Sequence, residues 1–367
     1  MLSRLAESLY WIGRYIERAD DTARIVDSYV HRMVEDPFND EDATCRSLYS
    51  ILGIDVDSDK PVTTEEMLQH IVYDADNPNS IAGSLSGAFE NARRSREFIS
   101  SEMWVALNST RNRLPQMENT ARRLGPSQYL LFVRERAALL AGLTDATLSH
   151  DDGWHFLVLG RSIERIDMTA RLLRGRVLSE EHAPDWLAFL RACGAMEAFM
   201  RSTSEIHDAN GVAAFLLLDR LFPRSVLFSL NLADTCLFEI QPGSQRIATA
   251  DVARQSLARG RGRLEFMDPA ELLGQLPELL EMLEETCVRI NNAVTDRFFR
   301  HEDYVCLLYT SPVSLVRSVA NRYSEKKSTS AGARRSLQEI AGAISPARLS
   351  DVYKRQGVTS PFPTTVA

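Results

Sequence analysis

Two segments of this chain, 147 residues apart, have nearly the same sequence. The first is WIGRYIERADDTARIV (11–26) and the second is LVLGRSIERIDMTARLL (157–173). When Gly13 is aligned with Gly160, nine of the thirteen positions from 13 to 25 are identical. Such an internal repeat predicts two copies of one structural unit, so it constrains the fold more than any local motif does.

Both segments have the apolar periodicity of an amphipathic helix. At about 100° per residue, the apolar residues of each segment fall on one side, as in a helix that buries one face in a bundle. Similar patterns, separated by turns rich in Gly, Pro and Asn, continue to about residue 300. We therefore predict an all-α fold: a helical bundle with two related halves, about 1–150 and 151–302, each carrying a repeated Gly-Arg-x-x-Glu-Arg helix motif.

The opposite side of each predicted helix is charged. The first segment places Arg14, Glu17, Arg18, Asp21 and Arg24 there, and the second places Arg161, Glu164, Arg165 and Arg171 there, with Met168 at the position of Asp21. Three interpretations remain open. These residues form weak ion pairs on a solvated face, worth about 0.2–0.5 kcal/mol each; or they form a buried network that joins the two halves; or they form a ligand or catalytic site, because guanidinium groups bind carboxylates through paired hydrogen bonds.

Four stretches of the chain carry a specific pattern. They are MLSRLAESLYWIGRYIERADDTAR (1–24), ARRSREFISSEMWVALN (92–108), GWHFLVLGRSIERIDMTARLL (153–173) and FPRSVLFSLN (222–231). Together they resemble the bacterial alpha-E domain family, from Met1 to about Arg300. The resemblance implies an all-helical domain that is typically encoded beside, or fused to, a circularly permuted ATP-grasp protein and a transglutaminase-like peptidase. It therefore implies a role in making or modifying a peptide or amide, and it leaves the reaction open.

The resemblance also marks further candidate positions. In the stretch 92–108 these are Arg93, Arg96, Ser100, Trp104 and Asn108. The residues alone would place Trp104 in the core and the arginines on the surface. Arg224 and Ser225 follow a proline at the start of a predicted helix, where free backbone N–H groups favour an anion. They can equally serve to satisfy buried backbone groups.

Two local patterns have a structural explanation. The segment HDDGWH (150–155) offers imidazole and carboxylate groups, as a metal site would, but an Asp at the N-cap of the repeated helix explains it at less cost. We therefore predict no metal site. Pro115 is expected to end a helix that begins at Ser80, because proline lacks the backbone N–H.

Composition and charge exclude several classes of protein. Hydrophobic residues make up 44% of the chain and charged residues 25%, as in a globular protein. After Glu302 there are nine Lys and Arg against four Asp and Glu, which leaves 33 against 46, a net charge of −13, in the preceding body. An acidic body argues against binding to nucleic acid. No apolar run reaches the ~18 residues of a membrane span, which predicts no membrane association.

The cysteines and the beginning of the chain predict its location. Five scattered cysteines without a Cys-x-x-Cys pair are typical of a reduced cytoplasmic protein. A charged amphipathic helix at once after Met1 predicts that there is no signal peptide.

From about residue 303 the pattern changes. VCLLYTSP (305–312) and DVYKRQ (351–356) look like adaptor-derived peptides at the ends of metagenomic gene predictions, and the segment between them has no sustained apolar period. We therefore predict a poorly ordered tail at 303–367, which an assembly artefact would explain.

The usual enzyme signatures are absent from the sequence. There is no Walker A run, no Gly-x-Gly-x-x-Gly after a strand, no Gly-x-Ser-x-Gly elbow and no Glu-x-x-His pair, so we expect no cofactor. Arginines close to a carboxylate lower its pKa, which favours binding over acid catalysis. We therefore predict that the Glu/Arg face binds a peptide, an amino acid or the ATP-grasp partner. The alternatives are an enzyme that uses Glu17 and Glu164 in an Arg-lined pocket, and a purely structural scaffold.

Overall fold

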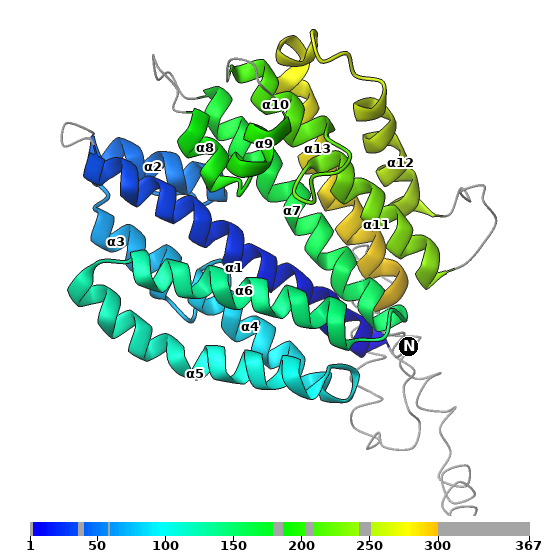
Figure 1. Cartoon of the computed structure of the whole chain (residues 1–367), viewed down its shortest axis with the longest axis horizontal. Helices are drawn as coiled ribbons and strands as arrows, with labels where there is room; N and C mark the ends of the chain where they lie inside the picture. Colours follow the sequence, from blue (N-terminus) through cyan, green and yellow to red (C-terminus); the bar gives the residue numbers. More distant parts are fainter. Residues whose placement is uncertain are drawn as a thin grey trace, which may run out of the picture. The chain divides into compact units, whose positions relative to one another are not determined.

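A computed structural model describes residues 3–35, 40–57, 59–178, 186–202, 208–241 and 251–299. All regular secondary structure in these ranges is helical, and they contain no strand, which confirms the all-α prediction (Figure 1). None of the helices in the described ranges is long and apolar enough to cross a membrane. The predicted tail at 303–367 lies outside the described residues. Its boundary and the division into two halves stay predictions.

The helices fall into two series along the chain. The first series is α1 (Ser3–Glu35), α2 (Glu41–Leu52), α3 (Thr64–Leu68) with the π turn η1 (Gln69–Tyr73), α4 (Ile81–Arg94), the 3-10 turn η2 (Arg96–Phe98), α5 (Ser101–Leu124) and α6 (Ser127–Thr147). The second is α7 (Asp152–Leu178), α8 (Trp186–Ala192), α9 (Met196–Ser202), α10 (Ala209–Leu218), α11 (Val226–Ile240), α12 (Val252–Glu265), α13 (Leu272–Val294) and the π turn η3 (Thr295–Phe299).

The two repeated segments lie on α1 and α7, which pack against each other closely. A Cβ atom on Gly13 would lie 2.0 Å from the backbone oxygen of Leu157, and one on Gly160 would lie 2.1 Å from that of Tyr10. The two contacts are related by the offset of the repeat, because Tyr10 and Leu157 each precede their own glycine by three positions. Only glycine, which has no Cβ, allows the two backbones to approach this closely.

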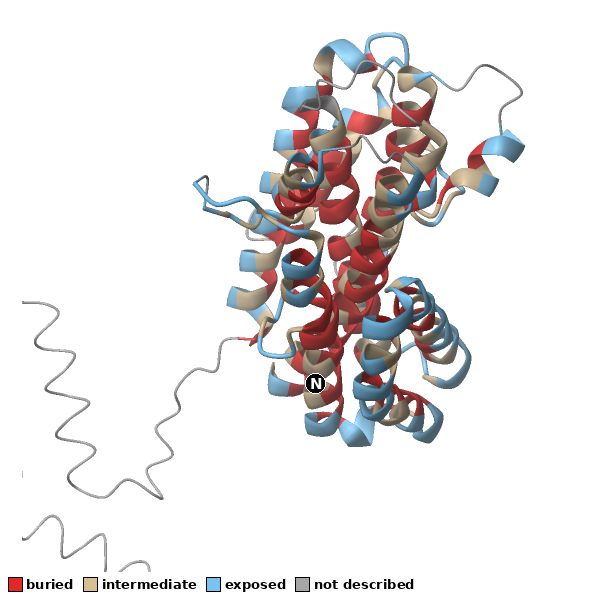
Figure 2. Cartoon of the chain, turned by 90° about the vertical axis from the view of Figure 1, so that its left-hand side faces the viewer, coloured by how far each residue is buried: buried red, intermediate tan, exposed pale blue. Residues whose placement is uncertain are grey.

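The other long helices surround this central pair. α4 and α6 pack against α1, while α11 and α13 pack against α7. α5 in turn packs on α4 and α6, and α12 packs on α11 and α13. Buried residues gather in the middle of the bundle and exposed residues lie on its outer helices (Figure 2). The charged face of each repeat therefore lies in the interior.

The expected helix from Ser80 to Leu114 is divided in the structure. α4 ends at Arg94, and α5 begins after Ser100, whose hydroxyl accepts a hydrogen bond from the backbone N of Met103 at 3.1 Å. Pro115 lies inside α5, so the expectation that it ends a helix is wrong. A serine N-cap starts a new helix wherever its hydroxyl reaches the free N–H groups. The packing of α5 on α6 offsets the local cost of proline, about 3 kcal/mol.

Alanine at Gly13 should destabilise the protein, because the added Cβ would overlap the backbone of α7. We expect the Gly13→Ala variant to lose about 1–3 kcal/mol of unfolding free energy, measured by urea denaturation. Gly142 in α6 is the matched control, since a Cβ there meets nothing within 4 Å. Gly142→Ala should leave stability unchanged or raise it by up to about 1 kcal/mol. Equal effects of the two variants would contradict a close crossing.

Candidate functional site

Glu164 on α7 is held by two arginines of the other repeat. Its side chain is 1% exposed, and its carboxylate accepts hydrogen bonds from Nε of Arg14 and Nε of Arg18, each at 2.5 Å. Arg14 also donates to Asn291 on α13 at 2.9 Å, and Arg18 donates to Asn79, just before α4, at 3.1 Å. One buried carboxylate thus ties together four parts of the bundle.

Glu17 on α1 is held in a related way from α7. Arg165 donates from Nε to Oε1 at 2.6 Å and from Nη2 to Oε2 at 2.9 Å. Arg224, just before α11, lies 3.2 Å from Oε1 of Glu17 and also pairs with Asp20 and Asp21. The charged face is therefore a buried network between the repeats and not a solvated surface.

A second repeated pair lies one turn further along each helix. Arg24 donates to Asp20 at 3.2 Å, and Arg171 donates to Asp167 at 3.0 Å. Asp20 is missing from the residues predicted from the sequence, although it is identical in both repeats. Identity at both positions is the signal that would have found it.

The turns that lead into α4 and α11 also correspond to each other. Their sequences are Pro-Asn-Ser (78–80) and Pro-Arg-Ser (223–225). Ser80 and Ser225 both cap their helices, and both hydroxyls donate to a backbone oxygen six residues earlier. The Ser225 hydroxyl also accepts a hydrogen bond from the backbone N of residue 228 at 3.1 Å. The hydroxyl, and not an anion, therefore satisfies this free N–H at the start of α11.

The two sides of the network differ in charge at these turns. Arg224 stands where the other turn has Asn79, and Asp21 stands where the other repeat has Met168. Arg224 and Asp21 are paired, with Nη1 and Oδ1 2.5 Å apart. The surroundings of Glu17, which we call the Glu17 side, therefore contain the Arg224–Asp21 ion pair. At the same positions the surroundings of Glu164, the Glu164 side, have the neutral residues Asn79 and Met168.

The pKa values follow from burial and from these partners. Burial raises the pKa of Glu17, but Arg165 and Arg224 outweigh it and bring the pKa down to about 2. Burial acts the same way on Glu164, and Arg14 and Arg18 again outweigh it, so its pKa is lowered. At Asp21 burial prevails over Arg224, and the pKa rises to about 7. Near neutral pH the two glutamates are thus charged, while Asp21 titrates.

Arg161 is the counterpart of Arg14 in the second repeat, but its surroundings differ. Arg14 donates to Asn291, whereas the residue 147 positions before Asn291 is Thr144, whose hydroxyl donates within its own helix at 2.8 Å. Nη2 of Arg161 lies 3.7 Å from Asp145, and Nε is buried without a hydrogen-bond partner among the described residues.

The pKa values of these two arginines change in opposite directions. Burial, and then the neighbouring Arg165, lower the pKa of Arg161. Burial acts in the same direction on Arg14, but Glu164 outweighs it and raises the pKa. Arg161 is therefore a buried cation that the fold compensates poorly.

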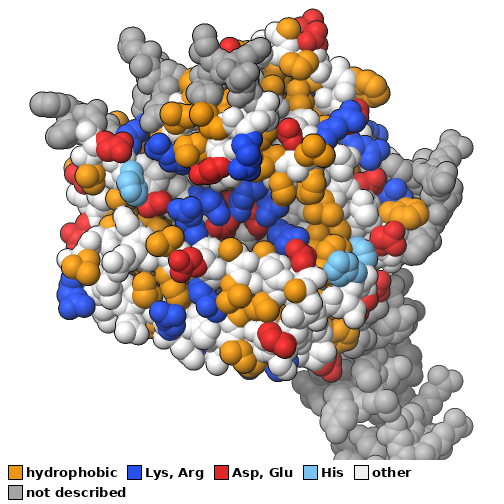
Figure 3. Space-filling view, viewed as in Figure 1, with side chains coloured by type: hydrophobic (Ala, Val, Ile, Leu, Met, Phe, Trp, Pro, Cys, Tyr) orange, Lys and Arg blue, Asp and Glu red, His pale blue; other side chains and the backbone are white. Residues whose placement is uncertain are grey.

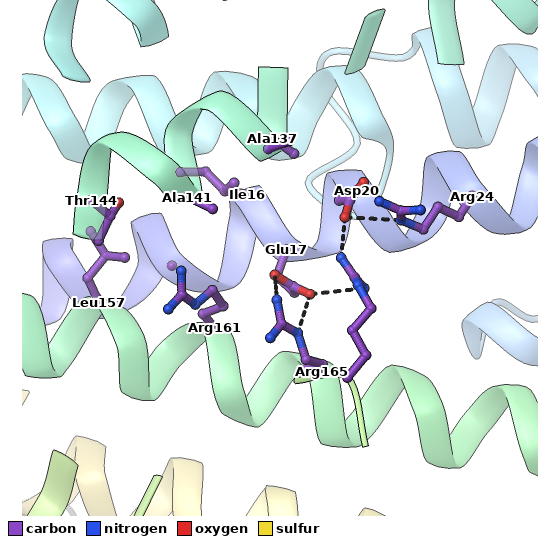
Figure 4. A pocket seen from close by; sticks show the side chains of 13 residues that line it. Ile16, Glu17, Asp20, Arg24, Ala137, Ala141, Thr144, Leu157, Arg161 and Arg165 are labelled. Atoms are coloured by element: carbon purple, nitrogen blue, oxygen red, sulfur yellow. Dashed lines mark hydrogen bonds and ion pairs between the residues drawn. The ribbon is translucent and has the colours of Figure 1, made fainter. Parts of the chain in front are cut away.

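A cavity of about 110 Å³ lies beside Glu17 between α1, α6 and α7, and we call it the Glu17 cavity. Its charged lining residues are Glu17, Asp20, Arg24, Arg161, Arg165 and Arg224. Ala137, Ala138 and Ala141 of α6 also line the cavity. Figure 4 shows Ala137 and Ala141 on the side opposite Glu17. On the face of the molecule seen in Figure 3, basic and acidic side chains gather in a hollow near the middle. Glu164 and Arg14 do not line the cavity.

The candidates between α4 and α5 lie elsewhere. Arg93 pairs with Glu90 on the surface at 2.8 Å. Arg96 lies over the ring of Trp104, 5.4 Å from its centroid, and Asn108 follows one turn later on α5. None of these candidates lines the Glu17 cavity, so their predicted binding role stays a prediction.

One group of acidic residues in the described ranges is close enough to bind a metal ion. It consists of Glu17, Asp20 and Asp21. Arg224 pairs with all three, so its guanidinium already supplies the positive charge that a metal would bring. In HDDGWH, Asp151 accepts from the backbone N of Gly153 at 2.9 Å, as expected of a residue that caps α7.

The raised pKa of Asp21 predicts a pH dependence. Between about pH 4 and 7 the folded chain keeps this proton, while the unfolded chain, with an ordinary pKa of 3.8, has lost it. The folded state binds more protons there, so the contribution of Asp21 to stability falls as the pH rises. The stability of the wild type relative to Asp21→Asn should therefore fall between pH 4 and 7 and level off above, in urea denaturation. A pH-independent difference would contradict the raised pKa.

A comparison with protein families points to the same Glu-Arg positions as the network between α1 and α7. The model of the Alpha-E family, described as a predicted alpha-helical domain with a conserved ER motif, matches residues 1–299. In this chain Glu-Arg occurs at 17–18 and 164–165, the network positions, and also at 135–136 on α6.

Curated relatives share this region at low identity. Uncharacterized proteins of Mycobacterium bovis and of Mycobacterium tuberculosis strain CDC 1551 are 24% identical over 307 residues, and that of strain H37Rv is 23% identical. Each match covers 76% of this chain and 35% of the relative, so the chain spans about a third of the length of these relatives. No solved structure matches. The family match and the Glu-Arg pairs at the α1–α7 crossing show that this chain belongs to the Alpha-E family.

Proposed function

We propose that the protein is the ligand-binding component of an ATP-grasp-linked system that makes or modifies a peptide or amide, and that it binds an anionic group of its ligand in the Glu17 cavity. The observation that carries this proposal is the charge of the lining. Four arginines face two carboxylates, within a body whose net charge is −13. A cavity of one sign with low-dielectric walls concentrates ligands of the opposite sign.

Arg161 gives the proposal its specific contact. Its Nε has no partner in the described part of the chain, and the carboxylate nearest to it lies 3.7 Å from Nη2. A ligand carboxylate would supply the missing counter-charge through a charge-assisted hydrogen bond. Such a contact would stabilise a cation whose pKa burial now lowers.

The titration of the two glutamates favours binding over acid catalysis. Because the pKa of Glu17 is about 2, it carries no proton to donate near neutral pH. Both of its oxygens are also engaged by Arg165, which weakens it as a base. A stand-alone enzyme that uses Glu17 and Glu164 is therefore the weaker alternative.

A purely structural role is favoured for the Glu164 side. Its carboxylate is 1% exposed and paired with two arginines that bond onward to Asn291 and Asn79. Removing one partner of such a buried pair costs about 3–5 kcal/mol. We therefore assign binding to the Glu17 side and cohesion of the bundle to the Glu164 side.

Equivalent substitutions in the two repeats test this division. We expect Arg161→Gln to weaken binding of N-acetyl-alanine at least tenfold in isothermal titration calorimetry, with little change in unfolding free energy. Arg14→Gln should instead lose about 3 kcal/mol of unfolding free energy, because Glu164 keeps only one arginine. If Arg161→Gln is as destabilising as Arg14→Gln and binds normally, the scaffold interpretation holds for both sides.

The proposed partners are an ATP-grasp ligase-like protein and a transglutaminase-like protein. The resemblance of the four sequence stretches supports them, and so does the greater length of the mycobacterial relatives, in which this domain is one part of a larger chain. A cytoplasmic location accords with the ATP supply that an ATP-grasp enzyme needs.

Co-expression tests this partnership. A strain that makes both this protein and the proposed ATP-grasp partner should accumulate a peptide or amide product, detected by mass spectrometry. Arg161→Gln should reduce that product by at least tenfold at unchanged protein levels. The same product from the ATP-grasp protein alone would remove this chain from the reaction.

A further inference from the structure

The side of α6 that faces away from the bundle is apolar. α6 packs on α1 and α5, and it crosses in front of α1 in Figure 1. Because a helix turns by about 100° per residue, six exposed residues of α6 fall within a sector of about 100°. Leu131 is 52% exposed and Leu139 is 41% exposed, and one of the six residues is charged. We call these residues the outer stripe of α6: Leu131, Glu135, Ala138, Leu139, Gly142 and Ala146.

The corresponding face of α13 is charged instead. α13 ends at Val294, 147 residues after the end of α6 at Thr147, so the two helices correspond through the offset of the repeat. At three exposed positions α6 has Leu131, Ala138 and Gly142, whereas α13 has Glu278, Glu285 and Arg289. Charged residues are usual on the solvated face of a helix, and an exposed apolar face indicates a contact with another molecule. The outer stripe is therefore expected to be covered.

The outer stripe is complementary to itself. Counted from its midpoint, between residues 138 and 139, every large residue on one side has a small residue at the same distance on the other side. The pairs are Leu131 with Ala146, Glu135 with Gly142, and Leu139 with Ala138. A Cβ on Gly142 would meet nothing within 4 Å, so this position has room for a side chain from another molecule. A two-fold axis requires such a pattern, because it brings the same surface of two copies together in reverse order.

The charges at one edge of the outer stripe are complementary as well. Arg134 and Asp145 are eleven residues apart, so their directions on α6 differ by only about 20°. A two-fold axis through the midpoint brings this edge of both helices together. Asp145 of one copy would then lie about 3 Å further along the helix axis than Arg134 of the other copy. Both side chains can reach each other there, since they are 52% and 32% exposed, and two such ion pairs would flank the contact.

We propose that the outer stripe is the interface of a homodimer with two-fold symmetry, in which α6 packs antiparallel on α6 of a second copy. This interaction goes beyond the proposed function. Ala138 belongs to the outer stripe and also lines the Glu17 cavity, so the contact borders that cavity in each copy. The dimer therefore brings two Glu17 cavities close to each other.

The length of α6 limits the strength of the dimer. The helix has 21 residues, which corresponds to about 31 Å. One antiparallel pair of helices of this length buries less than the ~1,600 Å² of a standard interface. We therefore expect a reversible dimer that dissociates on dilution.

Light scattering of the full chain over a range of concentrations tests the dimer. The molar mass should rise from that of one chain at micromolar concentration towards that of two chains in the submillimolar range. Leu139→Glu should abolish this rise, because residue 139 lies next to the two-fold axis and the two introduced carboxylates would repel each other. Leu273→Glu on α13 is the matched control, since Leu273 is 44% exposed and lies outside the outer stripe, and it should dimerise as the wild type does. Circular dichroism shows whether both variants are folded.

Cysteine cross-linking tests the antiparallel arrangement. The background is a Cys306→Ser variant, in which the four remaining cysteines are buried. Ala138→Cys should give a disulfide-linked dimer on mild oxidation, because the two copies of residue 138 lie only ~1.5 Å apart along the helix axis. Ala146→Cys should not, because its two copies lie roughly 22 Å apart along that axis.

Three outcomes would contradict the proposal. A wild type that stays monomeric at every concentration overturns the dimer and leaves the outer stripe to a different partner. A dimer that survives Leu139→Glu, or one that cross-links through residue 146 and not through residue 138, overturns the α6 interface. The proposed function stands or falls separately, because the Glu17 cavity lies within one chain.

Discussion

The close crossing of α1 and α7 is the contact on which the rest of the bundle depends. Gly13 and Gly160 bring the two backbones so near that the charged face of each repeat is buried against the other. A carboxylate in such a place must be paired, since an isolated buried charge costs several kcal/mol. Glu164 meets this requirement with Arg14 and Arg18, and Glu17 with Arg165 of the other repeat, so the fold and the network require each other.

The two sides of the crossing share one sequence pattern but differ in chemistry. Asn291 completes the hydrogen bonds of Arg14, while Thr144 turns its hydroxyl into its own helix and leaves Arg161 short of an acceptor. Small residues on α6 open a cavity at this second position. The charges around Glu164 are thus fully paired, whereas Arg161 stays partly unpaired beside the cavity in which we propose that a ligand binds.

Much of this could be predicted from the sequence. The period of the apolar residues predicted a helix over the first repeated segment, which lies within α1 (Ser3–Glu35), and the repeat identified Glu17, Glu164 and the arginines beside them in both copies. Asp20 could also have been predicted from the sequence, because it is identical in both copies of the repeat. The prediction that Pro115 ends a helix was wrong, because the packing that stabilises α5 around this proline comes from another helix and has no local sequence signal.

The sequence by itself determined the two repeated helices, their glycines and the charged residues that the two copies share, because these depend on neighbours within a turn or two. Only the tertiary structure decided that the charged faces meet and that Arg224 joins Glu17. It also decided that the cavity lies beside Glu17 and not beside Glu164. These features depend on how helices separated by more than a hundred residues are aligned against each other, and helical periodicity carries no information about that alignment.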